Sequence, residues 1–314
     1  MTNVTLIAGG VGGAKMAEGF DMCKEVELTI IGNVADDDEF HGLWVSPDID
    51  TIIYTLSGKI NRSQGWGVND EGHRALDVLK ELGKETWMFL GDRDFGLHIY
   101  RTERLKNGDR PSDITHDISQ RFGIKSKINL PTDDKVQTRV RTTEGWQTFQ
   151  EYFVRDKCVP DVLELHYEGL SQSSITHEAE SSIVNAELIV LAPSNPLVSI
   201  SPIIEIPGFN KVLQNTNVPI IAVSPLINGK VIKGPADKML ASLGYRPDVL
   251  GIAQYYKDVI SHLIIDEQDS SFFEDINSIG ISPYSTDILM RDAMDKKRLA
   301  LKILEIFYTL EEKA

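Results

Sequence analysis

Residues 4–15 read VTLIAGGVGGAK, and this stretch decides the fold. The uninterrupted apolar run from Val4 to Ala8 is typical of a strand buried on both faces. Glycines follow directly, and a helical pattern begins near Ala14. A second strand is expected from Glu27 to Ile31. The order strand, tight loop, helix, strand predicts a βαβ unit and a parallel sheet.

Further elements of the same kind follow along the chain. Buried strands are predicted at 86–90, 187–192, 219–223 and 262–265, and helices at 48–57, 70–82 and 288–310. Alternation of such strands and helices predicts an α/β fold, Rossmann-like, with a mostly parallel sheet.

The middle of the chain differs, because residues 125–167 are rich in β-forming residues. Strands are predicted at 136–142 and 146–154, and Gly145 between them favours a hairpin. We therefore expect one domain over 1–314, with an inserted mixed α+β lobe at about 107–185.

Composition excludes several classes of protein. Acidic residues outnumber basic ones, 47 to 32, which disfavours nucleic acid as a partner. No apolar run approaches the roughly 20 residues of a membrane span. Cys23 and Cys158 indicate two reduced thiols, and hence a cytoplasmic protein. Zinc is disfavoured, because the sequence has no Cys-x-x-Cys and no histidine pair at i, i+4.

The first candidate site is the glycine loop, in which Gly9, Gly10, Gly12 and Gly13 precede Lys15. Glycines open the backbone N–H groups to a ligand, the helix N-terminus favours an anion, and the lysine adds positive charge. The loop fits neither the dinucleotide fingerprint nor a Walker A sequence. The sequence therefore predicts a phosphate or diphosphate site, with a tight packing turn as the alternative.

Aspartates form the second candidate site. Asp36, Asp48 and Asp50 follow the second predicted strand, at the sheet edge where such folds bind ligands. Carboxylates and phosphate oxygens suit magnesium. Asp48 either caps a helix or binds metal or substrate, whereas Asp50 lies deeper in the first turn.

Three further segments carry polar or aromatic side chains. Gly91-Asp92-Arg93-Asp94 is expected at the end of the strand at 86–90, as an internal ion pair or as a cluster at the ligand-binding edge. Ser194 and Asn195 lie in a rigid Pro-Ser-Asn-Pro loop that suits a base, ribose or phosphate, with a stiff connector without a ligand as the alternative. Trp66, between two glycines, either stacks on a flat ring or fills a surface groove.

The order of these motifs resembles the 2-phospho-L-lactate transferase family over nearly the whole chain. The motifs are GGVGGAK (9–15), SPDIDT (46–51), WG (66–67), GDRD (91–94), FQ (149–150), PSNP (193–196), VSP (223–225) and GPA (234–236).

The resemblance implies a transferase of coenzyme F-420 biosynthesis. A phospholactyl or phosphoenolpyruvyl group would pass from a guanosine diphosphate-activated donor to the ribityl hydroxyl of the deazaflavin FO, with release of GMP. It also implies magnesium as cofactor and a homodimer. The alternatives are a nucleotide-sugar-binding regulator of related fold and an NAD-dependent oxidoreductase.

By the same resemblance, Asp50 and Arg93 contact the deazaflavin, while the glycine loop and Ser194-Asn195 contact the nucleotide. Asp50 is our choice for the base, with Asp48 or Asp36 on the metal. Asp50→Asn is expected to reduce turnover with little change in melting temperature, on the premise that no buried partner loses its counter-charge.

Overall fold

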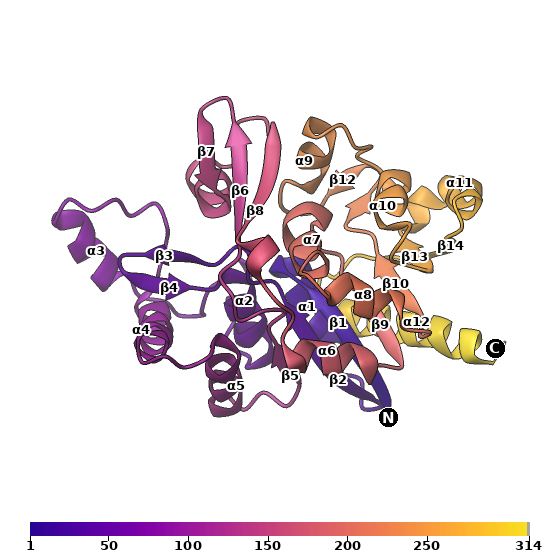
Figure 1. The fold of residues 1–314 in the computed structure, drawn as a ribbon, viewed down its shortest axis with the longest axis horizontal. Helices are drawn as coiled ribbons and strands as arrows, with labels where there is room; N and C mark the ends of the chain where they lie inside the picture. The colour runs from indigo at the N-terminus through magenta and orange to yellow at the C-terminus, as the bar shows by residue number, and fades with distance from the viewer. Residues whose placement is uncertain (313–314) are drawn as a thin grey trace.

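The computed structural model describes residues 1–312 and is built on a seven-stranded sheet (Figure 1). The strand order is β14-β13-β10-β9-β1-β2-β5, and every pairing is parallel. The strands are β1 (Thr2–Ala8), β2 (Val26–Gly32), β5 (Lys127–Asn129), β9 (Leu188–Leu191), β10 (Ile220–Val223), β13 (His262–Ile265) and β14 (Ser282–Ser285). The predicted Rossmann-like α/β fold is confirmed.

Helices cover both faces of this sheet, because successive strand side chains point to opposite sides. Leu6 and Ile30 belong to one apolar core, and Ile7 and Ile31 to the other. The first core is closed by α1 (Gly10–Asp21), α2 (Pro47–Leu56), α5 (Pro111–Arg121) and α12 (Ala293–Glu311). The second is closed by α6 (His177–Val184), α7 (Ser201–Ile204), α8 (Phe209–Gln214), α9 (Ala236–Ser242), α10 (Val249–Tyr256) and α11 (Phe273–Ser278).

An antiparallel three-stranded sheet stands apart from the central one, at the top of Figure 1. It consists of β6 (Gln137–Thr142), β7 (Gly145–Thr148) and β8 (Glu164–Glu168). The predicted hairpin is present, but its second strand ends at Thr148, and a π-helix occupies Glu151–Arg155. The predicted lobe at 107–185 thus includes this sheet together with α5, β5 and α6 of the main layers.

A second outlying unit lies at the left of Figure 1. It contains the hairpin of β3 (Asp38–Phe40) and β4 (Leu43–Val45), with α3 (Arg74–Glu81) and α4 (Asp92–Lys106). The strand predicted at 86–90 is wrong. Its apolar residues instead join a local cluster in which Leu90 is buried with Phe40 and Val45. The segment therefore gains burial without sheet pairing, and Gly91 caps α4 rather than ending a strand.

The parallel sheet brings several predicted segments to one edge. The glycine loop follows β1, the acidic segment follows β2 and the Pro-Ser-Asn-Pro loop follows β9. Ligands of open α/β sheets bind at this carboxyl edge. Within the described residues no helix has the length and hydropathy to cross a membrane.

The contact between α1 and α12 yields a test of the packing. A Cβ added to Gly19 of α1 would lie 2.4 Å from the Lys296 carbonyl oxygen of α12. Gly19→Ala should therefore destabilise the protein by about 1–3 kcal/mol in urea unfolding, because the two helices must separate. Gly96→Ala in α4 is the matched control, since a Cβ there meets nothing within 4 Å. It should stabilise by about 0.4–1 kcal/mol. Equal stability of the two variants would contradict the tight α1–α12 contact.

Candidate functional site

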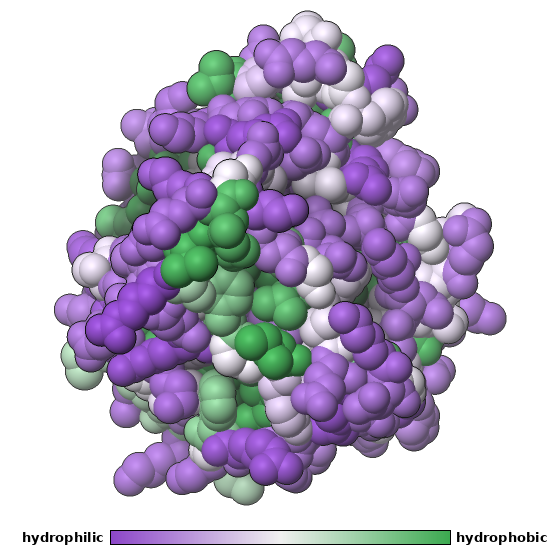
Figure 2. Space-filling view, turned by 90° about the vertical axis from the view of Figure 1, so that its left-hand side faces the viewer, coloured by the Kyte–Doolittle hydropathy of each residue, from purple (hydrophilic) through white to green (hydrophobic). Residues whose placement is uncertain are grey.

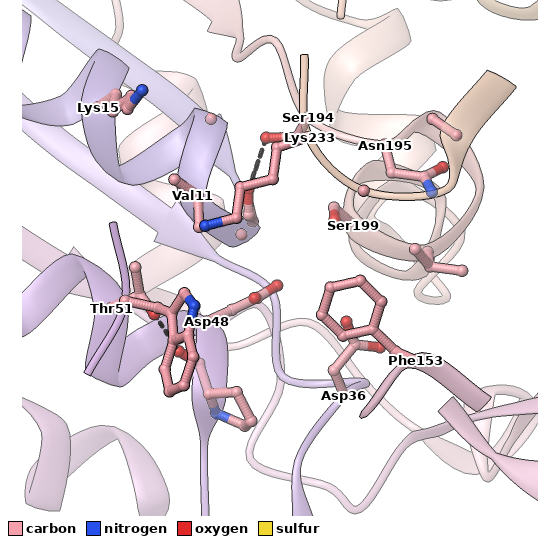
Figure 3. A pocket seen from close by; sticks show the side chains of 18 of the residues that line it. Val11, Lys15, Asp36, Asp48, Thr51, Phe153, Ser194, Asn195, Ser199 and Lys233 are labelled. Atoms are coloured by element: carbon pink, nitrogen blue, oxygen red, sulfur yellow. Dashed lines mark hydrogen bonds between the residues drawn. The ribbon is translucent and has the colours of Figure 1, made fainter. Parts of the chain in front are cut away.

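A cavity of about 610 Å³ opens at the carboxyl edge of the sheet. Most of the residues predicted for the site line it, namely Gly9, Gly10, Gly12, Lys15, Asp36, Asp48, Asp50, Trp66, Ser194 and Asn195. Gly13 and Arg93 are not among its lining residues. Figure 3 shows side chains from several distant segments directed into this space.

The glycine loop forms the start of α1 rather than a separate turn. The helix begins at Gly10, whose φ of +62° favours glycine, and so starts earlier than the predicted Ala14. Close packing also requires glycine here, because a Cβ on Gly12 would lie 2.2 Å from the Pro193 carbonyl oxygen. Gly13 packs closely against Ala8, because a Cβ added to Gly13 would lie 2.8 Å from the Ala8 Cβ. Both interpretations of the loop thus have support, and the helix N-terminus at the cavity favours an anion.

The Pro-Ser-Asn-Pro loop is fixed to the glycine loop. Ser194 Oγ donates a hydrogen bond of 2.6 Å to the carbonyl of Gly9. Asn195 Oδ1 accepts from the Leu197 amide at 3.0 Å and caps the π-helix Pro196–Ile200. Both residues therefore shape the cavity wall, and Figure 3 shows the Asn195 amide at its edge.

Asp36 and Asp48 are two buried carboxyl groups that face the cavity (Figure 3). Asp48 Oδ2 accepts from Asn33 Nδ2 at 3.0 Å, and burial raises the pKa of Asp48 to about 6. Burial, and next the charge of Asp48, raise the pKa of Asp36 well above its ordinary value. Ser46 occupies the N-cap of α2, so Asp48 is not the cap.

A magnesium ion fits the residues at this point. Asp36 Oδ1 is buried and has no hydrogen-bond partner in the described part of the chain. Two buried carboxyl groups that repel each other match the one or two carboxylates by which proteins hold Mg²⁺ beside substrate phosphates. A cage made by protein alone is not present among residues 1–312, since no cluster of three or more His, Cys, Asp or Glu side chains could hold a metal.

Asp50 lines the cavity but also has a buried partner. Its carboxylate accepts two hydrogen bonds from the Arg101 guanidinium, one of them at 3.1 Å, and both side chains are buried. His98 Nδ1 lies 3.7 Å from Asp50 Oδ2, and burial lowers the pKa of His98 to about 4, so the imidazole is neutral near pH 7. The premise that Asp50 lacks a buried partner is therefore wrong.

The Gly-Asp-Arg-Asp segment divides between the cavity and the surface. Asp94 lines the cavity and accepts a 2.7 Å hydrogen bond from Tyr54, while burial raises its pKa to about 6. Arg93 is exposed and donates to the carbonyl of Asn69 at 2.8 Å. The internal ion pair expected for this segment is not formed, because α4 separates the side chains.

Aromatic side chains also line the cavity. Phe149 and Phe153 stack with ring centroids 5.5 Å apart, and Trp66 and Phe89 are exposed at the lining. Figure 2 shows apolar side chains gathered at the centre of one face of the molecule, surrounded by polar ones. A flat ligand with an apolar surface suits these side chains.

Lys233 is a lining residue that the sequence reasoning missed. Among residues 1–312, neither Lys15 nor Lys233 forms an ion pair with a carboxylate; Lys15 donates to the Met290 carbonyl at 3.0 Å, and Lys233 to the Gln64 carbonyl. Burial lowers the pKa of Lys15, and the charges of Lys296 and Lys233 lower it further. The only sequence signal for Lys233 was its position directly before the Gly-Pro-Ala motif.

Comparisons with known proteins agree on one family. The model of the family "2-phospho-L-lactate transferase CofD" matches residues 4–304. A 2-phospho-L-lactate transferase of Methanococcoides burtonii is 35% identical over 96% of this chain and 98% of its own length. That of Methanopyrus kandleri is 36% identical over 96% and 97%. A phosphoenolpyruvate transferase of Streptomyces griseus is 33% identical over 96% and 98%.

Solved structures support the fold. A UPF0052-family protein of Bacillus halodurans superposes with a TM-score of 0.67 at 14% identity, over 96% of this chain and 98% of its own. Sequence likeness along the full length, and the cavity with its glycine loop and aspartates, point the same way. This chain belongs to the 2-phospho-L-lactate transferase CofD family of transferases.

Proposed function

We propose that this enzyme transfers a phospholactyl or phosphoenolpyruvyl group from a guanosine diphosphate-activated donor to the ribityl hydroxyl of FO, with release of GMP. The observation that carries the proposal is a single cavity in which the glycine loop and the buried aspartates lie together with several aromatic side chains. Relatives named for either acid match at similar identity, so both donors remain in the proposal. A homodimer, measurable by sedimentation, belongs to it as well.

The proposed reaction forms one phosphorus–oxygen bond and breaks another. The ribityl oxygen attacks the phosphorus that carries the acid, the bond to the GMP phosphate breaks, and the hydroxyl loses its proton. Such a transfer depends on in-line positioning and on neutralising the diphosphate charge. The N-terminus of α1 and Lys15 supply positive potential at the glycine loop. Magnesium beside Asp36 and Asp48 would supply the rest.

Asp50 is the proposed proton acceptor, and Arg101 gives that proposal its physical basis. The paired hydrogen bonds from Arg101 hold the Asp50 carboxylate in one orientation at the cavity wall. A fixed carboxylate can accept the proton of a hydroxyl placed within hydrogen-bond reach. Trp66, Phe149 and Phe153 line the cavity and would stack on the deazaflavin ring, which carries that hydroxyl into the cavity. Arg93 lies outside the cavity and enters only if α4 or its flanking loop moves.

The direct test is formation of GMP. Purified protein should release GMP when it is given FO, Mg²⁺ and either lactyl- or phosphoenolpyruvyl-diphosphoguanosine, and the ratio of the two rates identifies the donor. EDTA should stop the reaction while circular dichroism stays unchanged, because two carboxylates alone leave the diphosphate charge unbalanced. Turnover by repurified protein in EDTA would refute the metal requirement, and absence of GMP with both donors would refute the function.

Asp36→Asn separates metal binding from stability. The change should raise the Mg²⁺ concentration needed for half-maximal turnover by at least about tenfold, since one carboxylate ligand is lost. The melting temperature of the metal-free protein should rise, because asparagine is always neutral, whereas burial and the charge of Asp48 disfavour the ionised form of Asp36. Asp258→Asn, at an exposed position, is the control for both measurements. A lower melting temperature and unchanged magnesium dependence would exclude this role for Asp36.

Asp50→Asn should reduce both turnover and stability. Turnover should fall by about 10²-fold or more if the carboxylate accepts the proton. Stability should fall by about 3–5 kcal/mol, because the buried Arg101 loses its counter-charge. The double variant Asp50→Asn with Arg101→Met should regain part of that stability in urea unfolding but none of the turnover. Recovery of turnover in the double variant would show that Asp50 serves structure alone.

A further inference from the structure

Lys233 is the cation of the cavity wall that lies across from α1. It follows β12 (Lys230–Val231), and Figure 3 shows its side chain extending into the cavity toward Val11. Two nearby lysines have acidic partners, since Lys230 pairs with Asp237 and Lys238 with Asp161. Lys233 has none among residues 1–312, although the whole chain carries a net charge of −15. A lining lysine without a carboxylate points to an anionic ligand.

The one hydrogen bond of the Lys233 amine reaches a different segment, which we name the Trp66 loop (residues 60–68). Its ends pair at Ile60 and Val68. Inside it, the Gly65 amide donates to the Asn61 carbonyl at 2.8 Å. Lys233 donates to the carbonyl of Gln64, two residues before Trp66. The loop that carries the aromatic platform is thus joined to the opposite wall by a lysine.

The Trp66 loop also lies against the glycine loop. A Cβ on Gly65 would be 3.2 Å from Val11 Cγ1 and 3.8 Å from Lys233 Nζ. An ion pair of 2.8 Å between Arg62 and Glu18 fixes one side of the loop to α1. Near the tip of the loop, the hydrogen bond from Lys233 to the Gln64 carbonyl connects it to the other side of the cavity.

The Lys233 ammonium group can contact the Gln64 carbonyl and a ligand phosphate at the same time. It has three N–H donors, and the Gln64 carbonyl uses one of them. The other two are free to bind a phosphate oxygen at the glycine loop without breaking the existing contact. An anion placed there would also screen the repulsion between Lys15 and Lys233.

We propose that Lys233 is a positioning residue that binds an anionic group of a nucleoside diphosphate ligand and, through Gln64, fixes the Trp66 loop for the second substrate. Donor and acceptor then bind with positive coupling, because the amine that contacts the first also orders the platform for the second. The identity of the donor and the acceptor rests on the proposed function. The link between an anion bound at Lys233 and the order of the Trp66 loop does not depend on that function.

Hydrogen exchange with GDP and Mg²⁺ as the probe tests this link without FO. In the wild-type protein, saturating GDP should slow amide exchange in residues 60–68 by at least about fivefold. Lys233→Met should bind GDP about tenfold more weakly or worse and, even at saturation, show no slowing in these residues.

Two lysine variants serve as matched controls. Lys15→Met should also weaken GDP binding, but at saturation it should retain the slowing, since Lys15 does not contact Gln64. Lys230→Met, an exposed lysine on the same hairpin, should behave as wild type. Loss of slowing in either control, or persistence of slowing in Lys233→Met, would overturn the assignment.

A second measurement follows acceptor binding. FO fluorescence titrations should show at least about fivefold tighter binding with GDP present in the wild type, and no such gain in Lys233→Met. No GDP binding by wild type, or no slowing on binding, overturns the inference even if GMP is formed in the transfer assay. Slowing that depends on Lys233 supports it even if the transfer assay fails, so the two proposals fail separately.

Discussion

The contact between the glycine loop and the Pro-Ser-Asn-Pro loop is the constraint on which the site depends. The backbone of Gly12 approaches Pro193 so closely that no side chain fits, and the Ser194 hydroxyl bonds to Gly9. These loops follow β1 and β9, which are adjacent in the central sheet. Their contact aims the N-terminus of α1 at the cavity. The proposed anion site therefore depends on backbone geometry before any charged side chain contributes.

The acidic side of the cavity is placed by a different part of the fold. The β6–β7–β8 sheet holds the segment after β2 through the Thr138 amide, which donates to the Ala35 carbonyl at 2.7 Å, and Gln150, which donates to that of Asp36 at 3.3 Å. Gln137 donates to the Asp37 carbonyl at 2.9 Å. These bonds engage backbone carbonyls, and Asp36 Oδ1 is buried without a hydrogen-bond partner among residues 1–312. The separate sheet thus maintains a buried carboxyl where ordinary packing would neutralise or pair it.

The central sheet was predictable because β1, β9, β10 and β13 are buried on both faces and therefore read as apolar runs. The same signal failed at 86–90, where apolar residues pack into a small cluster instead of a sheet. It also missed β14, an edge strand of sequence SPYS. The pattern of apolar residues indicates which segments are buried. Burial alone does not distinguish a strand of the sheet from an apolar segment outside it, and it does not reveal a polar edge strand.

The residues of the candidate site likewise fall into those that could be predicted from the sequence and those that could not. Glycines and aspartates at strand ends could be predicted because position in an α/β unit is a local property. Arg101 could not be assigned to Asp50, since the two residues are 51 positions apart and belong to different helices. Lys233 reaches the cavity from the segment after β12, 169 positions along the chain from the Gln64 that it contacts. Partnerships of this kind depend on tertiary packing, which no single segment encodes.

The repulsion between Asp36 and Asp48 has a consequence for the life of the protein in a cell. A ligand that binds only the folded state shifts the folding equilibrium in proportion to its own supply. Burial and mutual repulsion disfavour ionisation of Asp36 and Asp48 in the empty protein, so the proposed metal and nucleotide should together stabilise it. Unliganded molecules would then open more often and be degraded sooner by proteases. We therefore expect the abundance of the enzyme to follow the availability of its donor, with no dedicated regulator required.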